Sequence, residues 1–123
     1  MKFRVKKAVI ANIISAAKSV YPNEFIALLG GDREKRVVDE IVVLPAVFGA
    51  VHSIIYSDLA PFDRRIVGSV HSHPSEYAVP SDADLQAFAR FGQINIIIAF
   101  PYTLDSMNFF DSRGKKISVE VVE

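Results

Sequence analysis

Two segments of helical periodicity alternate along this chain with short apolar runs that end at turn residues, and this order constrains the fold more than any other feature. In residues 6–20 the apolar side chains recur on one helical face, which predicts an amphipathic first helix. A second, shorter helix is expected to end near Gly92, with Leu85, Phe88 and Ala89 on its apolar face. The predicted strands are residues 25–29, 37–44, 66–73, 94–100, 107–111 and 116–122. The sequence therefore predicts a mixed α/β fold in which helices flank one curved β-sheet.

Turn residues set the expected strand boundaries near the N-terminus. The first strand is expected to end in a turn at Gly30 and Gly31, and a hairpin then joins it to residues 37–44. The segment that follows is harder to interpret. Residues 52–56 could form a strand, and residues 58–63 have the character of a loop.

Burial can be anticipated for several apolar residues in the second half of the chain. Residues 94–100 are apolar enough to be expected in the core, although an exposed strand of this kind could also pair two copies into a homodimer. Phe109 and Phe110 are neighbours on one strand, so one ring is expected in the core and the other at the surface. His52 is expected to be structural or exposed, although it could also lie near a functional site.

The composition limits the classes of partner. A chain of 123 residues, half of them hydrophobic, suits a single domain over residues 1–123 with a real core. The 14 Lys and Arg residues balance 14 Asp and Glu residues, so neither nucleic acid nor an anionic membrane is an expected partner. The absence of cysteine excludes disulfides and thiolate metal sites. Any bound metal must therefore be held by histidine and carboxylate groups.

The basic N-terminus precedes an apolar stretch at residues 8–17, as in a secretory signal. The two-faced pattern of this stretch favours a helix of the folded domain instead. No other stretch of the chain is long and apolar enough to span a bilayer. Together with the absence of cysteine, these features predict a cytoplasmic location.

A histidine pair at the end of a predicted strand carries the chemistry. His71 and His73 are separated by one residue and followed by Pro74, which ends the strand. Residues i and i+2 of a strand point to the same face about 7 Å apart, so both imidazoles can converge on one ion. Asp84 offers a carboxylate from the first turn of the next helix. Two histidines and one carboxylate leave a fourth position open, which is typical of catalytic zinc.

The same residues also have simpler interpretations. Ser81 and Asp84 have the spacing of a capping box, in which the serine is the N-cap of the second helix. Such a cap typically contributes about 1 kcal/mol and requires no catalytic role. A histidine pair on a strand is also often only structural. Capping and metal binding are compatible, because a cap fixes where the Asp84 carboxylate points.

Taken together, the segment His71-Ser72-His73-Pro74, six further residues, and then Ser81-x-x-Asp84 resembles the signature of the JAMM (MPN-plus) metalloproteases. That family also requires an upstream glutamate, and Glu24 stands before the apolar run 25–31 in the corresponding place. The resemblance implies a compact, cytidine-deaminase-like α/β domain with one zinc ion held by His71, His73 and Asp84. It further implies that Glu24 is the general base and that the Ser81 hydroxyl stabilises the oxyanion.

The resemblance also implies an activity and a class of substrate. Members of the family are zinc-dependent isopeptidases, so we expect hydrolysis of an amide bond at the C-terminus of a ubiquitin-like, β-grasp modifier. An extended tail of this kind could add to a sheet edge next to the zinc. Two alternatives remain: trimming of a sulfur-carrier protein, and a non-catalytic scaffold of the MPN-minus type. The chain is short and lacks cysteine, so it resembles a minimal, prokaryotic-type member of the family.

Overall fold

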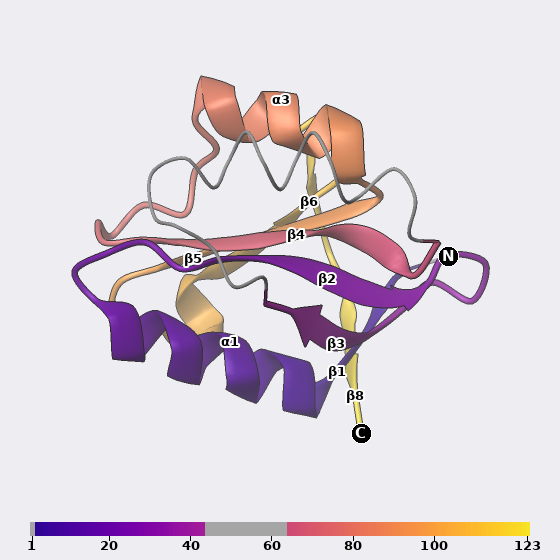
Figure 1. Ribbon diagram of the computed structural model, residues 1–123, viewed down its shortest axis with the longest axis horizontal. Coiled ribbons are helices and arrows are strands. Elements are labelled where there is room, and N and C mark those ends of the chain that lie inside the picture. Colours follow the sequence, from indigo (N-terminus) through magenta and orange to yellow (C-terminus); the bar gives the residue numbers. More distant parts are fainter. Residues whose placement is uncertain (1, 44–63) are drawn as a thin grey trace.

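The computed structural model describes residues 2–43 and 64–123 (Figure 1). The possible strand at 52–56, the loop at 58–63 and His52 lie outside the described residues. The elements are β1 (Arg4–Lys6), α1 (Lys7–Val20), β2 (Ile26–Asp32), β3 (Val37–Val42), β4 (Ile66–His73), α3 (Asp82–Phe91), β5 (Ile94–Ala99), η3 (Leu104–Ser106), β6 (Met107–Phe110), β7 (Lys116–Ile117) and β8 (Glu120–Val122). None of the helices in these two ranges has the length and apolarity needed to cross a membrane.

The strands of the described ranges form one sheet in the order β7-β6-β5-β4-β2-β3-β1-β8. The β2–β3 hairpin is antiparallel as predicted, whereas β4 pairs in parallel with β5, and β1 pairs in parallel with both β3 and β8. The two strands β7 and β8 lie at opposite edges of the sheet, yet only Ser118 and Val119 separate them in sequence. The sheet must therefore curl strongly. The predicted mixed α/β fold with one curved sheet is confirmed.

Helices cover both faces of the sheet, with α1 on one side and α3 on the other (Figure 1). The predicted first helix is confirmed, and its apolar face is buried in the main core through Val9, Ile10, Ile13 and Ala17. A smaller core under α3 includes Phe88 and Ile97. Strand β5 is buried throughout, as predicted.

The two-sided cover explains why one prediction for β6 was wrong. Phe109 and Phe110 point to opposite faces of the strand, but both rings are buried. Phe109 belongs to the main core, and Phe110 packs with Phe88 in the core under α3. The prediction of one exposed ring assumed that one face of the sheet is open to solvent.

The glycine pair also has a different role from the one predicted. Gly30 and Gly31 lie inside β2, and the turn that closes the hairpin is at residues 33–36. The register with β3 shifts between the two glycines, and a Cβ on Gly31 would collide with the Val37 carbonyl oxygen. These residues therefore allow close approach of two backbones at a bulge.

Two further details were missed. The short strand β1 precedes α1 and was not predicted. The single strand expected at 116–122 is divided into β7 and β8. Both differences involve very short strands at or next to the edges of the curled sheet, and strands of two or three residues carry little periodicity.

Candidate metal centre

The histidine pair lies at the C-terminal end of β4, in the middle of the sheet. Strand β4 spans the predicted residues and pairs along its length with β2 on one side and β5 on the other. His71 is opposite Ile26 and Ile97, and only 3% of its surface is exposed. His73 is the last residue of the strand and is half-buried. Pairing with β5 reaches both histidines and pairing with β2 reaches His71, so this central strand holds both backbones in place and fixes the directions in which the two imidazoles point.

Asp84 comes from the first turn of α3, where the predicted capping box is confirmed. The Asp84 N–H donates to the Ser81 Oγ at 3.2 Å, and the Ser81 N–H donates to the Asp84 Oδ2 at 2.8 Å. Asp84 is only 6% exposed, because the helix face turned toward the sheet carries Asp84, Ala87 and Phe88. The predicted apolar face was therefore wrong at Leu85 and Ala89, which are exposed. The candidate ligand Asp84 occupies part of the helix face that the pattern assigned to packing.

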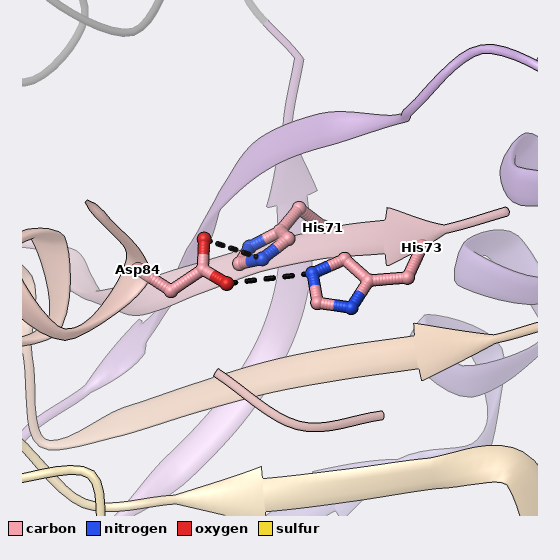
Figure 2. Close-up of side chains that lie close together, drawn as sticks. All are labelled: His71, His73 and Asp84. Atoms are coloured by element: carbon pink, nitrogen blue, oxygen red, sulfur yellow. Dashed lines mark ion pairs between the residues drawn. The ribbon is translucent and has the colours of Figure 1, made fainter. Parts of the chain in front are cut away.

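The three predicted ligands converge, as Figure 2 shows. The Nε2 of His71 lies 2.9 Å from Oδ1 of Asp84, and the Nε2 of His73 lies 3.4 Å from Oδ2. Within the described residues the three ligand atoms all lie within 4.8 Å of one another. The two imidazole rings have centroids 5.0 Å apart. Each histidine thus faces a different oxygen of one carboxylate.

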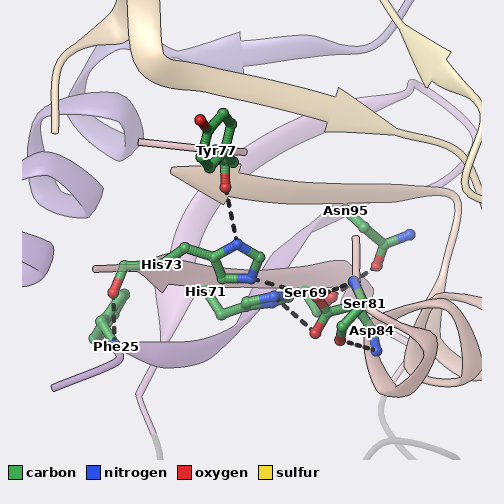
Figure 3. A network of polar contacts seen from close by, with 9 residues as sticks. Phe25, Ser69, His71, His73, Tyr77, Ser81, Asp84 and Asn95 are labelled. Atoms are coloured by element: carbon green, nitrogen blue, oxygen red, sulfur yellow. Dashed lines mark hydrogen bonds and ion pairs between the residues drawn. The ribbon is translucent and has the colours of Figure 1, made fainter. Parts of the chain in front are cut away.

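The tautomer of His73 follows from its second nitrogen. Its Nδ1 lies 3.1 Å from the carbonyl oxygen of Tyr77 (Figure 3). A carbonyl oxygen can only accept, so Nδ1 must carry the hydrogen, and in the neutral ring Nε2 presents its lone pair toward Asp84. Metal-bound histidines are commonly oriented in this way by a carbonyl behind them.

The electrostatics of the three groups are strongly coupled. Burial acts to raise the pKa of Asp84, but its contacts with His71 and His73 and the Ser81 amide outweigh burial and hold that pKa well below its usual range. Asp84 is also the main influence that raises the pKa of His73 above its ordinary value, against partial burial. The Tyr77 carbonyl and the charge of Glu24 raise the pKa of His73 further. A cation at this point is therefore favoured, whether it is a proton or a metal ion.

The residues present fit one zinc ion. Ligand atoms around tetrahedral zinc with bonds of about 2.0 Å lie about 3.3 Å apart. The Nε2 atoms of His71 and His73 lie 2.9 Å and 3.4 Å from different oxygens of Asp84, and one ligand atom from each residue lies within 4.8 Å of the others, so the three groups are close enough to surround one ion. The Nε2 of His71 is buried and has no hydrogen bond of regular geometry within the described residues, although Asp84 is close. An unsatisfied buried nitrogen is costly, and a metal would satisfy it. Two imidazoles and a carboxylate form a ligand set that catalytic zinc uses.

Glu24 lies at the same end of the sheet. It is exposed and precedes β2, which begins two residues later at Ile26. The Ser72 N–H donates to the Phe25 carbonyl at 2.9 Å, so the pairing of β2 with β4 continues past the last ladder pair. Extending that register by two residues from Ile26–His71 brings Glu24 opposite His73, on the face that carries both imidazoles.

A buried polar pair beside the centre was not anticipated. The Ser69 hydroxyl donates to the Asn95 side-chain oxygen at 2.7 Å (Figure 3). The Asn95 amide donates to the Gly92 carbonyl at 3.1 Å. Both side chains are fully buried. Gly92 is the C-cap of α3, so this pair ties one end of the helix to the sheet while the capping box organises the other end. The available signal was Asn95 itself, a polar residue within an otherwise apolar strand.

Comparisons with known proteins place the chain in a family. Residues 6–111 match the family of prokaryotic homologues of the JAB domain. The chain belongs to this family. A probable metalloprotease from Haloferax volcanii is 35% identical in an alignment of 119 residues. The match covers 89% of this chain and 73% of that protein. The predicted resemblance to JAMM and MPN proteins is thereby confirmed.

Solved structures agree with this JAB-domain assignment. A JAB1/MPN domain protein from Archaeoglobus fulgidus is 36% identical with a TM-score of 0.77, over 98% of this chain and all of that one. A structure of a metalloprotease-like JAMM zinc site has the same identity and TM-score and covers both chains fully. A protein from Desulfitobacterium hafniense, 19% identical with a TM-score of 0.65 over 98% of this chain and 93% of that one, shows the fold alone. The expected single zinc ion agrees with the triad and with the zinc-site neighbour. The cytidine-deaminase likeness and the cytoplasmic location stay predictions.

Proposed function

We propose that this JAB-domain protein is a zinc-dependent peptidase that hydrolyses an amide bond at the C-terminus of a ubiquitin-like, β-grasp modifier. The convergence of His71, His73 and Asp84 at one end of the sheet is the observation that carries the proposal. The metalloprotease relative and the neighbour with a zinc site support the hydrolase part. The choice of modifier rests on the motif resemblance.

The proposed roles of the protein groups follow from their positions. Zinc, when bound, polarises the scissile carbonyl and lowers the pKa of water toward about 7. Glu24 takes a proton from the attacking water and returns it to the leaving amine as the C–N bond breaks. Its exposure to solvent and the extended register that brings it opposite His73 support this role.

Ser81 is the proposed oxyanion donor. Its Oγ accepts the Asp84 N–H. The hydroxyl hydrogen has no acceptor within the described residues, so it can point toward substrate. Asp84, by accepting from the Ser81 N–H, holds the two residues in one rigid turn. A preorganised donor of this kind needs no rearrangement as charge develops on the carbonyl oxygen.

The test uses the β-grasp proteins encoded in the source genome, each joined through its C-terminal carboxylate to the side chain of a lysine peptide. The zinc-loaded wild type should release at least one of them, and Glu24→Gln should lower kcat by about 10²–10⁴ while keeping zinc. Glu34→Gln, an exposed glutamate in the hairpin turn, is the matched control. Equal cleavage by Glu24→Gln would refute its role as base.

The two alternatives give different outcomes in the same experiment. If the protein trims a sulfur carrier, mass spectrometry will show loss of C-terminal residues from the free carrier and no release of the lysine peptide. If it is a scaffold, the wild type will cleave neither substrate. The scaffold alternative requires missing metal ligands, and the described residues contain the full set.

A further inference from the structure

An extended segment, residues 77–80, links the two elements that carry the metal ligands. At one end the Tyr77 carbonyl accepts the Nδ1 hydrogen of His73 (Figure 3). At the other end the segment runs directly into Ser81, the N-cap of the helix that bears Asp84. The two ends of the segment therefore lie beside two of the candidate metal ligands, His73 and Asp84.

The backbone around this segment is held firmly. The Phe100 N–H donates to the Ser75 carbonyl at 2.9 Å, and the Asn108 side chain donates to the Ala78 carbonyl at 3.1 Å. Despite this support, Tyr77 is 71% exposed and Val79 is 63% exposed, while Ala78 between them is buried. Exposed, buried and exposed side chains in succession are typical of an extended strand with one free face. Two large apolar side chains thus face solvent from a well-supported backbone beside the ligands.

The segment also offers backbone groups for pairing. Neither the N–H nor the C=O of Val79 has a hydrogen-bond partner within residues 2–43 and 64–123. Strand β4 pairs with β2 through residues 66–71 and with β5 through residues 68–73, and beyond the β2 pairs the Ser72 N–H still donates to the Phe25 carbonyl. The Val79 backbone, in contrast, can accept an added strand without displacing an existing hydrogen bond among the described residues.

We propose that residues 77–80 form the edge on which the extended C-terminal tail of the protein substrate docks, a proposal that rests on the proposed peptidase function. The Val79 N–H and C=O pair with the tail backbone, and the Tyr77 and Val79 side chains contact apolar side chains of the tail. In strand addition, main-chain hydrogen bonds supply affinity and alternate side-chain contacts supply specificity. Since Tyr77 and Val79 are two residues apart, the preferred tail carries apolar residues at two positions separated by one residue.

Two substitutions test the contact kinetically, using the conjugate that the zinc-loaded wild type cleaves. Val79→Pro removes the N–H without touching a metal ligand, and should lower kcat/KM about tenfold through KM, with zinc per chain unchanged. Tyr77→Ser should lower it by a similar factor, because the side chain is lost while the backbone bond to His73 remains. Tyr77→Phe, which keeps the apolar ring, should restore most of the activity that Tyr77→Ser loses. Val121→Ser, an exposed valine on β8, is the matched control.

A binding measurement covers the case in which Val79→Pro loses zinc or fails to fold. A ten-residue peptide with the sequence of the tail is added to the zinc-loaded Glu24→Gln protein. Hydrogen exchange of the Val79 amide should slow at least tenfold, since a paired N–H is protected. Unchanged exchange, or protection only by a peptide from the leaving-group side, would overturn the docking of the tail.

The outcomes separate the two proposals. If the wild type cleaves a conjugate but folded, zinc-containing Val79→Pro and Tyr77→Ser cleave it equally well, the docking edge is wrong and the peptidase function stands. If the wild type holds one zinc per chain and cleaves none of the conjugates, the proposed function itself is wrong.

Discussion

Ser81 has a structural and a proposed catalytic role, and two substitutions separate them. The Ser81 Oγ accepts the Asp84 N–H, while the reciprocal bond runs from the Ser81 backbone N–H to the Asp84 carboxylate and does not use the Ser81 side chain. Ser81→Ala therefore removes the first bond and keeps the second. Loss of a serine N-cap typically costs about 1 kcal/mol, which lowers Tm by about 3–6 °C in a domain of this size. Glycine at the N-cap costs only a few tenths of a kcal/mol.

The catalytic loss should follow a different pattern. Both Ser81→Ala and Ser81→Gly delete the hydroxyl, and loss of one oxyanion donor typically costs about 10²–10³ in kcat. The two variants should therefore share the same low kcat, although only Ser81→Ala has a clearly lower Tm. Ser81→Thr keeps a hydroxyl and a good cap, so it should retain most of both properties.

The assay combines three measurements on each zinc-loaded variant: zinc per chain by elemental analysis, Tm by calorimetry, and single-turnover cleavage of the modifier conjugate. Ser118→Ala, at an exposed serine between β7 and β8, should match the wild type in all three. If both Ser81 variants keep zinc and cleave within threefold of the wild type, Ser81 is a helix cap only. A fall in kcat that appears only in Ser81→Ala would likewise refute the oxyanion role, because it would follow helix stability.

Three further predictions concern the metal and its support. Asp84→Ala should lower zinc from about one per chain to near none, measured by elemental analysis on protein purified without chelator, because the carboxylate contacts both histidines. Zinc affinity should fall as pH drops below the raised pKa of His73, since zinc needs the neutral ring; a chelator competition series that stays flat from pH 6 to 8 would contradict this. The same protonation has the opposite effect on the stability of the zinc-free protein. There protonated His73 stabilises the fold at pH below 6.5, and this contribution is lost as pH rises through the raised pKa of His73. Asn95→Ala should cost about 2–3 kcal/mol in the free energy of unfolding, because it breaks two buried hydrogen bonds; a loss below 0.5 kcal/mol in denaturant melts would show that the pair contributes little.

The parts of the fold that the sequence predicts are the long, strongly patterned ones. Residues 6–20 show a clear helical face, and the first helix forms almost as expected. The strand at 66–73 has the predicted bounds, because Pro74 stops it and both of its faces are buried. The errors occur where pairing decides local structure: at β1, at the division of residues 116–122, and at the glycines inside β2. A strand of two or three residues has too few side chains to show a period, and a bulge depends on the neighbouring strand.

The candidate ligands could be found from the sequence because their spacing matches a geometric requirement. His71 and His73 share a face in any strand, whatever lies around it. Asp84 could be found by its motif but not by helical periodicity, since it is buried at a position where the pattern requires an apolar residue. A buried carboxylate on the packing face of an amphipathic helix is costly unless it has polar partners, and here the imidazoles of the strand beneath supply them.

The groups that orient the ligands are harder to find because they act through their backbone or through contacts remote in sequence. Tyr77 holds His73 with a carbonyl that any residue would supply, so its identity reveals nothing of that role. The Ser69–Asn95 pair joins two strands and ties the end of α3 to the sheet through Gly92, and only the parallel register of β4 and β5 brings the two side chains together. A motif therefore locates the candidate ligand atoms, whereas the accuracy of their placement depends on tertiary contacts. Variants such as Asn95→Ala should consequently weaken zinc binding without changing a single ligand.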